Sequence, residues 1–274
     1  MSWFNLKLEP LARTSFRWEK LTECSFPITL VLLEGGVVGV IAAKIYQVSP
    51  ITLAIISAAP MFANLSSFAW NRVASGRPKV GLACLLQIGI LLCVLAVAIA
   101  PINELGAIVL VASMIVSRIL VAGLVTVRSV IWSLNYARSK RAQATGQLQM
   151  IASLVTVIIA SIVGPILDRH PDGMPWLYVM GVATGLIGIG LFRRVTVIGE
   201  SEHIRKESEA NNQRQQSVSF TTILRQDRRF AKYQMSMFAA GFGNMLIEAP
   251  LILLITRELA ASYSTSIALT MVIP

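Results

Sequence analysis

The sequence has few charged side chains for its length. Charged residues make up 14% of the 274 positions, whereas a soluble globular domain carries about 25%. Hydrophobic residues reach 55%, and they gather in long runs separated by short basic segments. This composition excludes an ordinary soluble domain and predicts a chain embedded in a lipid bilayer.

Cysteine and histidine are also scarce. The chain has three cysteines (Cys24, Cys84 and Cys93) and two histidines (His170 and His203). Cys84 and Cys93 do not have a metal-ligand spacing, and the histidines lie far apart in the sequence. We therefore expect no metal site and no cofactor, with the cysteines as free thiols in apolar surroundings.

The formal net charge is +10, which in a soluble protein would favour nucleic-acid binding. Here the basic residues lie between the apolar runs. No basic helix or aromatic platform accompanies them, so we expect no nucleic-acid partner.

Seven apolar segments are long enough to cross a bilayer, which takes about 20 residues of helix. They cover residues 26–46, 51–70, 80–100, 105–128, 147–167, 176–192 and 233–256, and an eighth run begins near 265. Backbone groups inside lipid must bond within the chain, so the segments predict an all-α, polytopic transmembrane helical bundle. The eighth run is too short to cross before Pro274, so we expect more spans beyond this sequence.

Basic residues are distributed unevenly between the two sides of this bundle. Of the 24 Lys and Arg residues, 19 lie in the N-terminal segment and in the connections after every second span. The opposite side has three, which are Lys44, Arg169 and Arg257. Connections rich in Lys and Arg stay in the cytoplasm. The count predicts a cytoplasmic N-terminus in an integral protein of the plasma (inner) membrane.

The runs divide the chain into four parts. They are an N-terminal cytoplasmic or interfacial segment (1–25), a six-helix bundle (26–192), a cytoplasmic linker (193–232) and the start of a second, truncated bundle (233–274). Aromatic and basic residues alternate in the first part, which is typical of an amphipathic segment on the membrane surface. A partly ordered tail is the alternative. The polar composition of 199–219 predicts a mobile linker.

Four ionisable residues fall inside the predicted spans: Glu34, Arg118, Arg128 and Glu248. Each costs about 2.5–3.5 kcal/mol to insert into lipid, so such residues usually face a cavity or a partner. Arg128 lies near the cytoplasmic end of its span and can reach the headgroups. Glu34 and Arg118 lie roughly 12 and 15 Å of helix rise from the same side. Their similar depth and opposite charge predict a pair.

Glu248 is related to Glu34 by a weak internal repeat, a feature that transporters often contain. Shifting the chain by 214 positions superimposes the first span on the seventh, with Glu34 on Glu248 and Pro60 on Pro274. Glu34, Arg118 and Glu248 are therefore the candidate substrate or coupling residues. The alternative for Glu34 and Arg118 is a fixed ion pair that serves packing alone.

The loop between the second and third spans reads Ser67-Phe-Ala-Trp-Asn-Arg-Val-Ala-Ser-Gly-Arg-Pro-Lys79. It resembles the signature loop of the major facilitator superfamily, in which a Gly precedes Asp-Arg, then Gly and a basic cluster. Ser67 replaces the first Gly and Asn71 the Asp, and Gly76 comes two residues late. Arg72, Arg77 and Lys79 keep the basic character, although a positive-inside loop would place these three cations here too.

Two further motifs are similar to those of the same family. Arg118 and Gly123 follow its arginine-then-glycine pattern in the fourth span. Gly164-Pro165 follows its Gly-Pro pattern in the fifth span, without the flanking glycines. The resemblance implies two helical halves joined by a cytoplasmic linker, with spans one, four and seven lining a central cavity. Glu34, Arg118 and Glu248 would then face the transport pathway.

We therefore expect a secondary transporter that moves a small solute by alternating access, coupled to a proton or ion gradient. The chain has no G-x-x-x-x-G-K phosphate loop for direct use of ATP. A membrane-embedded enzyme is one alternative, but it needs clustered catalytic side chains. The nearest candidate, Asp168–Asp172, lacks a second histidine and a nucleophile, so we expect no enzyme. A receptor or scaffold that docks through 199–219 is the other alternative, and that linker carries no evident motif.

Overall fold

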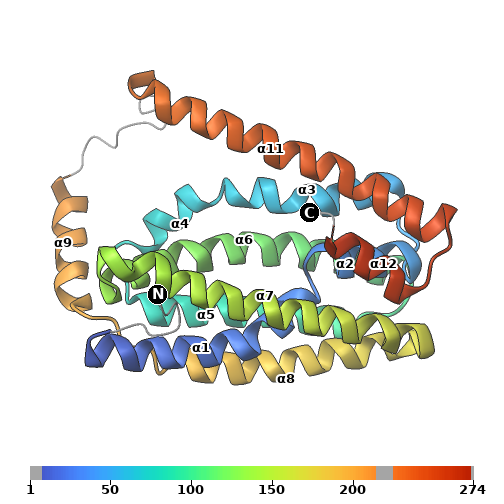
Figure 1. The fold of residues 1–274 in the computed structure, drawn as a ribbon, viewed down its shortest axis with the longest axis horizontal. Coiled ribbons are helices and arrows are strands. Elements are labelled where there is room, and N and C mark those ends of the chain that lie inside the picture. Colours follow the sequence, from blue (N-terminus) through green and yellow to red (C-terminus); the bar gives the residue numbers. More distant parts are fainter. Residues whose placement is uncertain (1–7, 214–224, 273–274) are drawn as a thin grey trace.

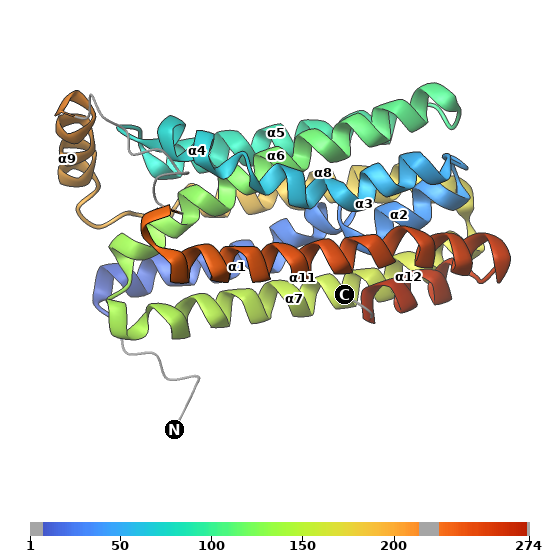
Figure 2. The ribbon, with the colours of Figure 1, turned by 90° about the horizontal axis from the view of Figure 1, so that it is seen from above.

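The computed structural model describes residues 8–213 and 225–272. Long helices run side by side along one direction, and α9 (Glu200–Gln213) lies across one end of them (Figures 1 and 2). We call this end of the bundle the linker end and the opposite end the distal end.

The first six predicted spans form helices in chain order. They are α1 (Pro10–Val31) with α2 (Gly35–Lys44), α3 (Pro50–Asn64) with α4 (Ser67–Ala74), α5 (Lys79–Ile99), α6 (Glu104–Asn135), α7 (Arg138–Arg169) and α8 (Met174–Phe192), which follows a short 3-10 turn, η1 (Pro171–Gly173). After α9 come α11 (Arg228–Leu253), a π-helical turn η2 (Leu254–Glu258) and α12 (Tyr263–Val272).

The lengths and composition of these helices suit a membrane. Within the described ranges, six helical segments are long and apolar enough to cross one, and the α3–α4 pair, bent by 44°, makes a seventh if it counts as one span. Large apolar side chains such as Ile51, Leu85 and Ile108 point outward and are exposed. The predicted all-α transmembrane bundle is therefore confirmed.

Local capping explains where several helices begin. Ser49 accepts a hydrogen bond from the Thr52 N–H, and Pro50 occupies the first turn of α3. The Asn103 side chain accepts from the Gly106 N–H at the start of α6. Asp227 accepts from two backbone N–H groups at the start of α11. Each cap satisfies N–H groups that have no partner inside the helix.

The start of α1 differs from the sequence prediction. The helix begins at Pro10 and runs into the bundle without a boundary at residue 26, so residues 10–25 are not a separate segment on the membrane surface. Phe16 is buried in one cluster with Tyr136, which follows α6, and Leu148 of α7. Hydropathy missed this part of the helix because its charged residues find partners inside the bundle. Residues 1–7 lie outside the described part.

The linker also differs from the prediction of a wholly mobile segment. Residues 200–213 form α9, which is held against the loop between α4 and α5. α11 begins at Arg228, five residues before the predicted span. The remaining linker residues, 214–224, lie outside the described part, as does Pro274 of the internal repeat.

Small residues bring α8 close to α1. A Cβ atom on Gly181 would lie 2.5 Å from a Leu32 methyl, and one on Gly185 would lie 2.5 Å from the Thr29 hydroxyl. The Thr29 hydroxyl donates to the Gly181 carbonyl at 2.6 Å. Such close approach of backbones is typical of helix packing in membranes. It anchors α1, the linker-end part of the first span, against α8.

α11 packs differently along its length. Residues 232–240 are exposed on every side, whereas Ala249 and Ile252 nearer the distal end are buried in the main apolar core. There α11 contacts α3, and α12 contacts α2 and α7. Figure 1 shows α11 diverging from α3 toward the linker end. α11 and α12 therefore pack against the first six spans at the distal end.

Candidate functional site

The first span is broken at Glu34. α1 ends at Val31, and α2 begins at Gly35 after an extended Glu34. Gly35 has φ +53°, a left-handed conformation that glycine adopts without steric cost. Tyr178 donates its hydroxyl proton to the Leu32 carbonyl at 2.8 Å, satisfying a group that the break releases. Broken helices often form substrate and ion sites in transporters.

Glu34 meets Arg118 at this break. Arg118 Nη1 lies 2.6 Å from Glu34 Oε1. The two side chains are unequally buried, because Arg118 is 9% exposed and Glu34 is 45% exposed. The structure thus brings together the two residues that the sequence analysis placed at similar depth. A partly exposed carboxylate on a buried arginine can exchange its partner more readily than a sealed pair can.

Both residues line a cavity of about 450 Å³. It lies between the first six spans and the two that follow, and its lining includes Glu34, Gly35, Ser57, Arg118, Glu248 and Thr270. Glu248 of α11 also lines it. All three sequence-predicted substrate or coupling residues therefore line one cavity.

Two buried polar atoms in the cavity lining have no hydrogen-bond partner among the described residues. They are the Ser57 hydroxyl and the Arg118 Nε–H. Leaving a buried donor unsatisfied costs about 1–3 kcal/mol. The remaining lining is largely apolar and includes Met114, Met245 and Met271. Sequence reasoning missed Ser57 and the methionines, because apolar spans contain many such residues that only pack.

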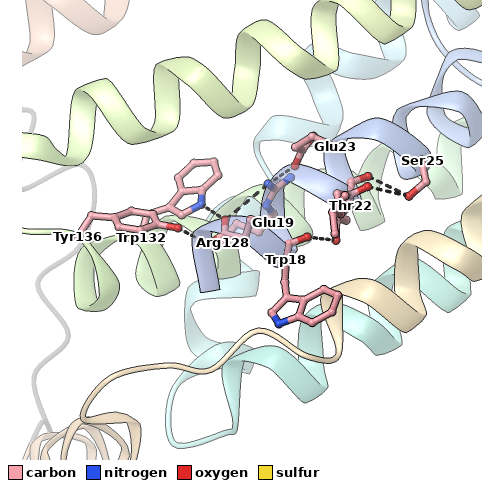
Figure 3. A network of polar contacts seen from close by, with 9 residues as sticks. Trp18, Glu19, Thr22, Glu23, Ser25, Arg128, Trp132 and Tyr136 are labelled. Carbon is pink, nitrogen blue, oxygen red and sulfur yellow. Dashed lines mark hydrogen bonds and ion pairs between the residues drawn. The ribbon is translucent and has the colours of Figure 1, made fainter. Parts of the chain in front are cut away.

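A second ionic cluster lies nearer the linker end, and Figure 3 shows it. Arg128 pairs with Glu23 and lies 3.9 Å from Glu19 Oε2. The Trp132 indole and the Tyr136 hydroxyl each donate to Glu19 at 2.6 Å. Glu19 is fully buried. We call these five residues the buried cluster.

The buried cluster corrects one prediction and reveals one omission. Arg128 does not reach toward headgroups, because two carboxylates of α1 hold it inside the bundle. Sequence reasoning missed Glu19 and Glu23 because they precede the predicted span. Their four-residue spacing matches that of Arg128, Trp132 and Tyr136, and such spacing places side chains on one helix face. That pattern could have indicated the contact.

The signature-loop residues divide into two groups. Asn71, Arg72 and Arg77 are exposed. Lys79 is fully buried, and its ammonium lies 2.6 Å from Glu207 Oε2 of α9. The Gly76 N–H donates to the same oxygen at 2.9 Å, and Gly76 has φ +72°. The loop thus serves as the docking site of α9.

The electrostatics of this contact favour an ionised Glu207. Partial burial acts to raise the pKa of Glu207, but the hydrogen bonds from Lys79 and Gly76 and the Lys79 charge outweigh it. The net effect is a pKa below the ordinary value of 4.5. No local pattern predicts this pairing, since Lys79 and Glu207 are 128 positions apart.

Charged side chains also join the two groups of helices at the distal end. Asp168 of α7 accepts hydrogen bonds from the backbone N–H groups of Tyr263 and Ser264. Lys44 of α2 donates to the Ala261 carbonyl, and its ammonium lies 4.4 Å from the centre of the Tyr263 ring. Asp168, which the sequence analysis considered as part of a catalytic loop, thus contacts the start of α12.

These features define an α-helical membrane protein with a charged internal cavity at a helix break, as solute transporters have. The sequence profile of the Major Facilitator Superfamily matches residues 28–274. The chain belongs to this family, whose members are membrane transporters of small solutes. The family resemblance seen in the sequence is confirmed. A comparison with curated proteins gives no match.

Proposed function

We propose that this protein is a secondary transporter that moves a small solute by alternating access and couples the movement to a proton or ion gradient. Glu34, Arg118 and Glu248 are the substrate or coupling residues. The predicted first half (26–192), extended by the start of α1 from Pro10, is joined by the linker (193–232) to the second half, which begins with α11 from Arg228.

The observation that carries this proposal is the cavity between the two groups of helices. It holds three ionisable side chains and is bordered by the broken first span. Ionisable residues at membrane depth commonly mark substrate and ion pathways. A fixed packing interface would fill this space and pair all of its charges.

Polar contacts at the distal end support alternating access. At the distal end, Asp168 and Lys44 tie α7 and α2 to the segment that follows α11. We interpret these contacts as the closed end of one transport state. Separating them would open the distal end and produce the opposite state.

The orientation follows from charge. The Lys and Arg residues concentrate at the linker end, so the N-terminus and α9 lie in the cytoplasm under the positive-inside rule. The protein would then reside in the plasma (inner) membrane, with the distal end outside.

Uptake by proteoliposomes tests this function. The purified full-length protein is reconstituted, and a panel of labelled small solutes is presented with and without an imposed pH gradient. At least one solute should accumulate only with the gradient. Glu34→Gln should abolish this accumulation and leave downhill exchange. Glu104→Gln is the matched control, because Glu104 is exposed at the distal start of α6, outside the cavity. Uptake that ignores the gradient would contradict the coupling.

A further inference from the structure

The charges that line the cavity do not balance. Two carboxylates, Glu34 and Glu248, face one guanidinium, Arg118. Arg118 is bonded to Glu34 at 2.6 Å. Glu248 has no ion pair or hydrogen bond to any side chain that the structure describes. With all three groups ionised, the lining carries one excess negative charge, and that charge sits on Glu248.

An excess, partly buried carboxylate such as Glu248 selects the charge of what enters. An isolated ionised carboxylate in an apolar setting is costly, so it takes up a proton or pairs with a cation. An anion would meet two carboxylates and an arginine already engaged by one of them. A neutral solute would leave Glu248 uncompensated. A cation is therefore the solute that the uncommitted charge favours.

The rest of the lining indicates the body of the solute. Most of the surface around Glu248 is apolar, and three methionines contribute to it: Met114 from α6, Met245 from α11 and Met271 from α12. Methionine is flexible and polarisable, so it adapts to apolar groups of different shape. A cavity of about 450 Å³ lies within the range that holds drug-sized molecules.

We propose that the cavity binds organic cations that carry a single positive charge on an apolar body. Glu248 pairs with the charge, and the three methionines contact the body. Binding at Glu248 does not require Arg118 to release Glu34, so that pair stays available for the coupling role proposed above. This inference names the substrate class and rests on the proposed transport function, but binding can be measured without transport.

The probes are two ions of nearly the same shape and opposite charge, tetraphenylphosphonium and tetraphenylborate. Each is measured separately by equilibrium dialysis against the purified protein in an uncharged detergent, with protein-free micelles as the blank. The protein should bind the phosphonium at least about tenfold more tightly than the borate. Equal binding of both ions, or tighter binding of the borate, would overturn the proposal.

Variants assign the effect to one carboxylate. Glu248→Gln should weaken phosphonium binding about tenfold or more, whereas Glu248→Asp should retain the preference for the cation. Glu258→Gln should bind as the unchanged protein does, because Glu258 is exposed on η2 and does not line the cavity. Size-exclusion elution and thermal unfolding show whether each variant is folded. Unaltered phosphonium binding by folded Glu248→Gln would overturn the proposal, whatever the uptake experiments show.

Discussion

Two ionic clusters with the same set of charged residues link the first span to α6, and they have different surroundings. Each contains two glutamates and one arginine. In the buried cluster, Glu19 and Glu23 surround Arg128, and every glutamate has a described partner. In the cavity, Glu34 holds Arg118 and Glu248 stays uncommitted. The clusters differ in how many hydrogen-bond donors surround the charges.

The two clusters occupy successive positions along the same pair of helices. Glu34 lies 11 residues after Glu23, and Arg118 lies ten residues before Arg128. α1 and α6 run in opposite directions, so each glutamate meets an arginine at its own depth. A rule that treats any ionisable residue in a span as functional would select both clusters. The cavity distinguishes the two clusters, because a solute can reach only Glu34, Arg118 and Glu248.

The largest effect should come from removing the buried arginine. Arg128→Met leaves Glu19 and Glu23 inside the bundle without a cation. Breaking a buried pair from one side costs about 3–5 kcal/mol. We expect this loss of unfolding free energy in detergent, measured by denaturant titration. The triple variant Glu19→Gln, Glu23→Leu, Arg128→Met should recover most of it. Unchanged stability of Arg128→Met would show that the cluster does not hold α1 to α6.

The equivalent change in the cavity should affect transport more than stability. Arg118→Met leaves Glu34 partly exposed to water, so the cost should be about 1 kcal/mol. Gradient-driven uptake should fall by at least about tenfold, because the exchangeable pair is lost. The double variant Glu34→Leu, Arg118→Met should remain inactive while folding normally. Full uptake by that variant would mean that the pair only packs.

How far the sequence could predict these clusters depends on how far apart the paired residues lie along the chain. Hydropathy located the spans, since about 20 apolar residues suffice to identify one, and depth arguments placed Glu34 beside Arg118. The first half of α1 was missed because Glu19 and Glu23 look unsuitable for a bilayer until Arg128, more than 100 positions away, is known to pair with them. The adjacent glycines Gly35 and Gly36 could have signalled the break.

The docking of α9 could not be predicted for a similar reason. Glu200 and Glu207 in a polar linker are typical of solvent-exposed residues, and only tertiary contact gives them partners. The backbone N–H of Lys79 donates to Glu200 Oε1, and its ammonium donates to Glu207. This third ion pair, Lys79–Glu207, is intermediate in burial between the two clusters. Its lysine is fully buried, and its glutamate is 23% exposed.

The smallest expected effect is the response of this third pair to acid. The pKa of Glu207 is lower in the docked state than its ordinary value of 4.5. Docking is therefore favoured by ionised Glu207 above pH 4.5 and weakens as the pH falls through that value toward the lowered pKa. The change should be about 1 kcal/mol, as for a partly exposed pair.

Pulsed electron paramagnetic resonance measures the docking of α9 through the distance between two nitroxides. The nitroxides are attached at Ser201→Cys and Arg77→Cys, in a variant without the three native cysteines. The distance distribution should be narrow at neutral pH and broaden as the pH falls below 4.5. Glu207→Gln should broaden it at neutral pH and remove the acid response. A narrow distribution for Glu207→Gln at all pH values would mean that Glu200 and packing alone hold α9, and the third pair would then contribute nothing to docking.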